Sequence, residues 1–371
     1  MSTVIQGRIV TDTGLIDDGV VVVEGADITD VRPTGRLRTI HKRASWVLPG
    51  FVDIHVHGGG GHTFTTGDPE AARAAAAFHA KHGTTTMLAS LVTAAPEILL
   101  AATTAYQPLI DDGTLAGLHF EGPYLSAARC GAQNPAYLRD PDPAELERLL
   151  AIGGVRMVTI APELPGAVDA IRLLVDRGVV AAIGHTDATY EQTLAGIQAG
   201  ATVGTHVCNA MRPVHHRDPG PIVALLDANE VICEQVADGV HLHDGMLRHN
   251  VRSAGAARIA LVTDAMSAAG MADGSYELGG QPVTVHDGVA RLLGDGSIAG
   301  STLTMDAALR RAVQSGVSVA DAARMAATTP ALALGLERIG VLAAGAQADL
   351  VLLDDELRVV DVLRRGKPVA E

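Results

Sequence analysis

The stretch Pro49-Gly-Phe-Val-Asp-Ile-His-Val-His-Gly58, followed by three more glycines, indicates both the fold and the chemistry of this chain. Residues 51–56 have the apolar character of a short strand. Because side chains alternate along a strand, His55 and His57 point to the same side and can chelate one metal ion. The glycines predict a loop whose backbone passes close to a ligand. An isolated His-x-His more often marks two ordinary polar residues, so the interpretation depends on the later strands.

Length and composition limit the class of protein. The 371 residues exceed the usual size of one core and suit a large barrel with an accessory domain. The apolar content of 47% is enough for a sizeable core, although only 3% of residues are aromatic, so aliphatic side chains must fill it. The net charge of −14 argues against a nucleic-acid partner, and an anionic substrate would need a local cationic site.

The chain has no apolar run approaching the roughly 20 residues that span a bilayer. The N-terminal segment lacks the basic and then apolar pattern of a secretory signal. The three cysteines are too few and too scattered for a disulfide framework. We therefore expect a cytoplasmic protein without a membrane partner.

Strand and helix patterns alternate through residues 49–336, which predicts an α/β fold of the (β/α)8, TIM-like barrel type. Strands are expected at 51–56, 84–90, 116–120, 155–160, 179–183, 201–207, 231–236 and 258–262. Helices are expected at 69–82, 96–111, 143–150, 166–177, 189–199, 220–228, 244–254, 303–315 and 318–327, with β hairpins at 276–300.

The two ends of the chain both carry short β patterns, and neither end is long enough to form a core alone. We expect residues 1–48 and 337–371 to pair into one small β-sandwich domain. The barrel, residues 49–336, would then be inserted between its halves as the catalytic domain.

Polar residues stand at several expected strand ends, which is where such barrels carry their chemistry. They are His55, His57, Glu121, His185, His206, His241 and Asp264. As unrelated buried groups, each would need its own hydrogen-bond partner, whereas one shared divalent cation satisfies several together. Imidazole with carboxylate and no thiolate suits zinc, iron, manganese or cobalt.

These residues, in this order, resemble the amidohydrolase superfamily. The finer motifs resemble the N-acetylglucosamine-6-phosphate deacetylase family. They are Leu118-His-Phe-Glu-Gly-Pro-Tyr-Leu125, His206-Val-Cys-Asn-Ala-Met211, Arg217-Asp-Pro-Gly220, Val262-Thr-Asp-Ala265, Ala299-Gly-Ser-Thr-Leu-Thr-Met305 and Gly345-Ala-Gln-Ala-Asp349. The resemblance covers nearly the whole chain and implies metal-dependent release of acetate from N-acetylglucosamine 6-phosphate, giving glucosamine 6-phosphate.

The resemblance also implies a metal centre. Glu121, His185 and His206 match the principal ligands of the family. His55 and His57 match the additional pair found in members that hold a second ion. We expect one or two divalent ions in each subunit, with zinc favoured and Glu121 bridging two positions.

The resemblance further assigns catalytic and substrate-binding roles. Asp264 matches the carboxylate that takes a proton from the metal-bound water and delivers it to the departing amine. His241 matches the residue that polarises the acetyl carbonyl. The candidate substrate contacts are Asn209, Ala210, Arg217, His241, Ala132 and Leu303. In the family, the counterpart of Arg217 reaches the phosphate across a dimer interface, so we expect a homodimer.

Three alternatives stay open from the sequence. The first is deacetylation of the galacto epimer. The second is hydrolysis of a cyclic amide, against which Glu121 argues, because cyclic-amide members commonly bridge their metals with a carboxylated lysine. The third is a non-catalytic sugar-phosphate binder, for which Asp264 and His241 would have no use.

Overall fold

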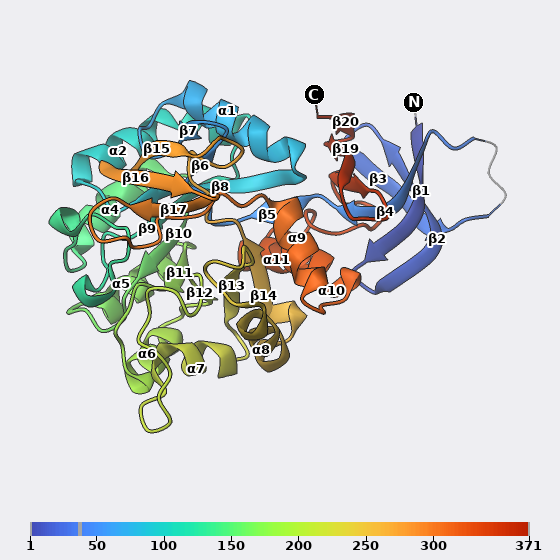
Figure 1. Cartoon of the computed structure of the whole chain (residues 1–371). Helices are drawn as coiled ribbons and strands as arrows, with labels where there is room; N and C mark the ends of the chain where they lie inside the picture. The colour runs from blue at the N-terminus through green and yellow to red at the C-terminus, as the bar shows by residue number, and fades with distance from the viewer. Residues whose placement is uncertain (1, 36–38, 370–371) are drawn as a thin grey trace.

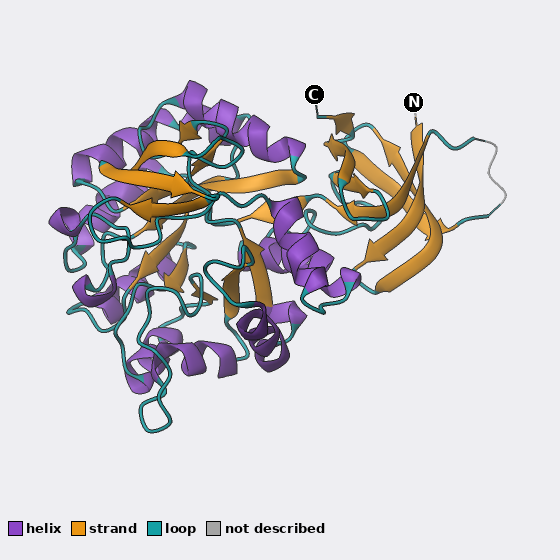
Figure 2. Ribbon diagram, viewed as in Figure 1, coloured by secondary structure: helices purple, strands orange, loops and turns teal. Residues whose placement is uncertain are grey.

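The computed structural model describes residues 2–35 and 39–369 and confirms the predicted barrel. Eight strands form one sheet in which neighbours run parallel (Figures 1 and 2). In sheet order they are β5 (Phe51–Asp53), β8 (Thr84–Val92), β9 (Gly117–Glu121), β10 (Val155–Ile160), β11 (Val180–Ile183), β12 (Val203–Gly204), β13 (Ile232–Val236) and β14 (Ile259–Val262).

The first and last strands of this sheet meet at their carboxyl ends. The amide of Asp264 donates to the carbonyl of His55 at 2.9 Å, and the amide of His57 donates to Ala265 at 2.8 Å. The Thr263 hydroxyl also donates to the buried Asp53 carboxylate at 2.6 Å. These bonds close the ring at the end where the predicted ligands lie.

Helices surround the barrel, as Figure 2 shows in purple. They are α1 (Pro69–Lys81), α2 (Pro96–Ala105), α3 (Gln107–Asp111), α4 (Pro143–Ile152), α5 (Ala167–Asp176), α6 (Tyr190–Gln198), α7 (Gly220–Asp227), α8 (Asp244–Ala254), α9 (Met305–Gln314), α10 (Val319–Ala323) and α11 (Thr329–Ala333). Local sequence sets their starts: Asp68 caps α1, and Thr189 forms a capping box with Gln192 at α6.

Several expected elements are shorter than the sequence pattern suggested. The strand expected at 51–56 is limited to Phe51–Asp53. The strand expected at 201–207 is limited to Val203–Gly204, because His206 and Cys208 adopt left-handed backbone conformations that an extended strand cannot contain. The helix expected at 96–111 divides at Tyr106, two residues before Pro108, which has no amide hydrogen to continue the helix.

The insertion after β14 forms the expected hairpins. Its strands β15 (Gly274–Leu278), β16 (Gln281–His286) and β17 (Val289–Leu292) pair antiparallel and enclose a small apolar cluster of their own.

The two ends of the chain pair into one small β domain, as expected, and its strands belong to a single seven-stranded sheet (Figure 1, blue and red). Its order is β20 (Lys367–Pro368), β19 (Val359–Arg364), β18 (Leu350–Leu353), β4 (Lys42–Pro49), β1 (Ser2–Thr11), β2 (Gly14–Glu24) and β3 (Asp27–Pro33). The sequence did not reveal β4 and β20. Along β18, Leu350 and Leu352 join the core of this sheet, whereas Val351 and Leu353 join the barrel core. The domain boundaries at 48/49 and 336/337 stay a prediction.

Among the described residues, no helix combines the length and the apolar character that crossing a membrane requires.

Gly50 joins the terminal sheet to the barrel with no room for a side chain. A methyl group there would lie 2.2 Å from the Thr85 hydroxyl and 2.8 Å from Cβ of Asp349. We expect Gly50→Ala to lower the free energy of unfolding by about 1–3 kcal/mol, as overpacking does. Urea denaturation checks this. Gly294→Ala is the control, because a methyl group there meets nothing within 4 Å. Equal stability of the two variants would contradict the prediction.

Candidate metal and active site

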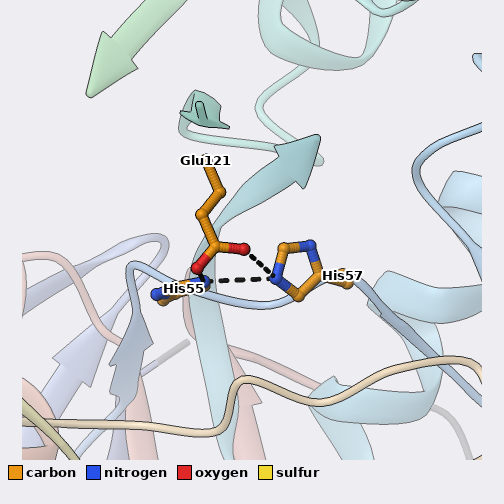
Figure 3. Close-up of side chains that lie close together, drawn as sticks. All are labelled: His55, His57 and Glu121. Atoms are coloured by element: carbon orange, nitrogen blue, oxygen red, sulfur yellow. Dashed lines mark hydrogen bonds and ion pairs between the residues drawn. The ribbon is translucent and has the colours of Figure 1, made fainter. Parts of the chain in front are cut away.

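The first group of possible ligands lies where β5 and β9 end. His55 Nε2 is 3.2 Å from His57 Nε2 and 3.3 Å from Glu121 Oε1. His57 Nε2 is 3.2 Å from the other carboxylate oxygen, Oε2 (Figure 3). All three side chains are buried, and their ligand atoms lie close enough together to hold a metal ion.

A second group shares the same carboxylate. Nε2 of His185, after β11, is 3.0 Å from Glu121 Oε1, and Nε2 of His206, after β12, is 2.9 Å from it. The two imidazole nitrogens are 3.1 Å apart. These three residues also form a possible metal site. Glu121 therefore belongs to both groups, and the nitrogen and oxygen donors fit a divalent transition metal.

Backbone hydrogen-bond acceptors fix the orientation of two of the imidazoles. His57 Nδ1 lies 3.2 Å from the carbonyl of Ser90, and His185 Nδ1 lies 2.9 Å from the carbonyl of Arg129. A carbonyl only accepts, so each Nδ1 carries the hydrogen. The lone pair of each neutral ring is then on Nε2, the atom that faces Glu121.

The electrostatics of the cluster also favour positive charge. Although burial alone would raise the pKa of Glu121, the adjacent His55 and His185 lower it well below its usual range. Burial alone would lower the pKa of His57, but hydrogen bonds with Asp264 and Glu121 raise it to about 9. A divalent cation would satisfy the same demand for positive charge.

Asp264, after β14, lies between the ligand cluster and His241. Its Oδ1 is 3.2 Å from His57 Nε2, and its Oδ2 is 3.6 Å from His241 Nε2. Burial opposes ionisation of Asp264, but the hydrogen bond from His57 and the charge of His55 lower its pKa to about 2. Asp264 is therefore an ionised acceptor.

His241 has a half-buried partner in Asp238. Its Nδ1 donates to Asp238 Oδ2 at 2.7 Å. Burial alone would lower the pKa of His241, yet this hydrogen bond and the charge of Asp264 raise it. The imidazolium form of His241 is therefore stabilised. Its second ring hydrogen is on Nε2, the nitrogen that faces Asp264.

Backbone strain gathers at this site. Among the described residues, eight other than glycine have positive φ angles, and five of them are at or beside the predicted site. These five are His185 (48°), His206 (26°), Cys208 (87°), Ala210 (48°) and Asp264 (49°). Such conformations each cost of order 1–3 kcal/mol and are typical of functional sites.

Four of the five candidate ligands, all except His55, line a cavity of about 250 Å³. It is lined by His57, Glu121, Gly131, Ala132, Gln133, His185, His206, Asn209, Ala210, His241, Asp264, Leu278, Ser297, Ile298 and Gly300. Asn209, Ala210, Ala132 and His241, which we expected to contact substrate, are thus beside the metal ligands.

Two predicted contacts are not brought to this cavity. Leu303 lines a neighbouring cavity with Asp238 and Thr304. Arg217 lies in the loop between β12 and α7, where its guanidinium contacts the ring of His216. Their roles toward substrate stay predictions.

Sequence reasoning missed two polar side chains that touch the cluster. Gln133 donates to Glu121 Oε2 at 2.6 Å and accepts from the Thr93 amide at 2.8 Å. Glu234, on β13, accepts from His55 Nδ1 at 2.9 Å. A charged residue inside the strand expected at 231–236 was the available signal for Glu234.

Comparison with known proteins agrees with this geometry. Residues 46–369 match the model of the amidohydrolase family, so the chain belongs to that family. It is 37% identical to an N-acetylglucosamine-6-phosphate deacetylase of Lysinibacillus sphaericus over 87% of this chain and 85% of the relative. It is 36% identical to an N-acetylgalactosamine-6-phosphate deacetylase of Escherichia coli O157:H7 over 97% of both chains.

Solved structures give the same result. An aspartate-to-alanine mutant of N-acetyl-D-glucosamine-6-phosphate deacetylase from Mycobacterium smegmatis, in complex with N-acetyl-D-glucosamine-6-phosphate, matches with a TM-score of 0.97 and 45% identity over the whole of both chains. The N-acetylglucosamine-6-phosphate deacetylase of Thermotoga maritima matches with a TM-score of 0.92 and 33% identity, again over both whole chains.

Cation binding should displace protons from this cluster. At pH 8 an ordinary imidazole is already neutral, but the raised pKa of His57 keeps its proton until a cation takes its place. We therefore expect Zn²⁺ binding to release protons at pH 8 and to become tighter as the pH rises from 6 to 8. Titration calorimetry in two buffers with different heats of ionisation measures this. Glu121→Gln, which alters the carboxylate common to both groups, is the control and should bind weakly. Binding without proton release would contradict the prediction.

Proposed function

We propose that this chain is a metal-dependent hydrolase that converts N-acetylglucosamine 6-phosphate into glucosamine 6-phosphate and acetate. The observation that carries the proposal is the meeting of Glu121, four imidazoles, Asp264 and His241 in one cluster, all of which except His55 line a cavity of about 250 Å³. The family and the relatives that share this architecture support it.

We further propose two cation positions, with Glu121 bridging them, and zinc as the metal in preference to iron, manganese or cobalt. One position would use His55 and His57, and the other His185 and His206. A cation there would lower the pKa of a coordinated water toward neutrality and supply the nucleophile.

Asp264 is the proposed proton-transfer residue. Its low pKa keeps it ionised, so it can accept a proton from the attacking water. The same carboxyl group then delivers that proton to the departing amine. Its distances of 3.6 Å from His241 and 3.2 Å from His57 support a role between the proposed electrophile and the proposed metal ligands.

His241 is proposed to polarise the acetyl carbonyl. Because Nδ1 donates to Asp238, a hydrogen on Nε2 requires the imidazolium, which the raised pKa favours. That hydrogen would stabilise negative charge on the carbonyl oxygen as water attacks. A single donor of this kind is typically worth about 10² to 10³ in rate.

The phosphate end of the substrate is proposed to bind Asn209, Ala210 and the Arg217 of a second subunit. The loop that carries Arg217 projects from the barrel between β12 and α7 (Figure 1). A guanidinium supplies the paired donors that a phosphate accepts. Ala132 and Leu303 complete the proposed contacts. The homodimer and the cytoplasmic location are proposed together with this arrangement.

Deacetylation of N-acetylgalactosamine 6-phosphate is the second candidate, because a relative that covers 97% of this chain carries that name. Cyclic-amide hydrolysis is disfavoured, since Glu121 stands where cyclic-amide members commonly carry a carboxylated lysine. Simple sugar-phosphate binding would leave Asp264 and His241 without a role.

Acetate release tests the reaction. We expect zinc-loaded protein to release acetate from N-acetylglucosamine 6-phosphate in preference to the galacto epimer and the unphosphorylated sugar. Asp264→Asn should lower kcat by about 10² to 10⁴, because it removes the proton-transfer group. Asp244→Asn, at a half-buried surface carboxylate, is the control. Faster turnover of the galacto epimer would favour the second candidate, and no turnover of any substrate would refute deacetylation.

Mixing of variants tests the shared site. If Arg217 acts across a dimer, a heterodimer of Arg217→Ala with Asp264→Asn contains one site with both native residues. Random exchange should therefore restore about a quarter of the wild-type activity, although each variant alone is weak. Native mass spectrometry measures the fraction of heterodimer. Heterodimers that recover no activity would show that Arg217 does not act across the interface.

A further inference from the structure

Glu234 is a buried carboxylate beside the metal ligands that the proposed reaction does not use. It lies on β13 and is fully buried. Its Oε2 accepts from His55 Nδ1 at 2.9 Å and from the His206 amide at 3.0 Å. Its Oε1 has no hydrogen-bond partner among the described residues. A buried carboxylate costs several kcal/mol unless positive charge compensates it.

The imidazole of His55 depends on this side chain for its tautomer. The corresponding nitrogens of His57 and His185 face backbone carbonyls, which no substitution of the acceptor residue removes. His55 Nδ1 instead faces the Glu234 carboxylate. An ionised carboxylate accepts and cannot donate, so the hydrogen of neutral His55 is on Nδ1 and the lone pair is on Nε2.

The number of carboxylates in the buried cluster also bears on the role of Glu234. Glu121, Asp264 and Glu234 together bring three negative charges to the site. One divalent cation would leave one of these negative charges uncompensated, whereas two would exceed them by one positive charge. Without Glu234, a single divalent cation would already balance Glu121 and Asp264. The carboxylate of Glu234 therefore adds negative charge beyond what one divalent cation compensates.

We propose that Glu234 is a positioning residue that holds the hydrogen of His55 on Nδ1 and so presents Nε2 to the cation shared with His57 and Glu121. This inference rests on the proposed metal centre. It assigns Glu234 to the position served by His55 and His57, although the carboxylate also bonds the backbone of His206.

Cation affinity tests the role without any substrate. Co²⁺ titration followed by visible absorbance, with metal per chain from mass spectrometry, compares wild type with Glu234→Leu and Glu234→Gln. We expect Glu234→Leu to raise the Kd of one cation by about 10- to 100-fold, as loss of such partners usually does. Glu234→Gln retains an acceptor oxygen and should recover part of the affinity. Gln235→Met is the matched control, because Gln235 is also fully buried on β13 but bonds Asn250.

A double-mutant cycle tests whether Glu234 affects cation binding through His55. If Glu234 acts through His55, adding Glu234→Leu to His55→Asn should change Co²⁺ affinity by less than threefold beyond His55→Asn alone. Circular dichroism and thermal denaturation confirm that each variant is folded. Folded Glu234→Leu with wild-type affinity, or a loss that persists undiminished in the His55→Asn background, would overturn the proposal. Because acetate release is not measured, failure of the proposed reaction would leave this test intact.

Discussion

Convergence of four imidazoles on the carboxylate of Glu121 is the constraint on which the rest of the site depends. Nitrogen atoms of His55, His185 and His206 all lie within 3.3 Å of one oxygen of this carboxylate. Such a contact can exist only if several strands end at the same height. The hydrogen bonds from the Asp264 amide to His55 and from the His57 amide to Ala265, at the two edges of the sheet, provide that alignment by closing the barrel.

Much of the fold could be predicted from the sequence because its cues are local. Alternating apolar strands and capped helices gave the barrel, and polar residues at the strand ends gave its ligands. The apolar pattern overestimated the length of β12, because the left-handed backbone conformation of His206 limits that strand to two residues. It also failed at β4, whose pairing with β1 and β18 is set by tertiary contact rather than by a clear pattern of its own.

The site was predictable to a different degree. His55 and Asp264 carry motif information, so their proximity followed from the barrel. Glu234 and Gln133 could not be identified in the same way, because their importance lies in which ligand atom each one bonds. Arg217 is limited in a different way. Its predicted partner is a site in a second chain, and no pattern within one chain shows where that site lies.

The walls of the cavity come from two separate sources. Strand ends supply the candidate metal ligands, whereas Leu278, Ser297 and Ile298 belong to the hairpin insertion after β14. The insertion has its own apolar cluster and contributes no predicted ligand. Evolution can therefore alter the surface that surrounds a sugar while the hydrolytic machinery stays the same.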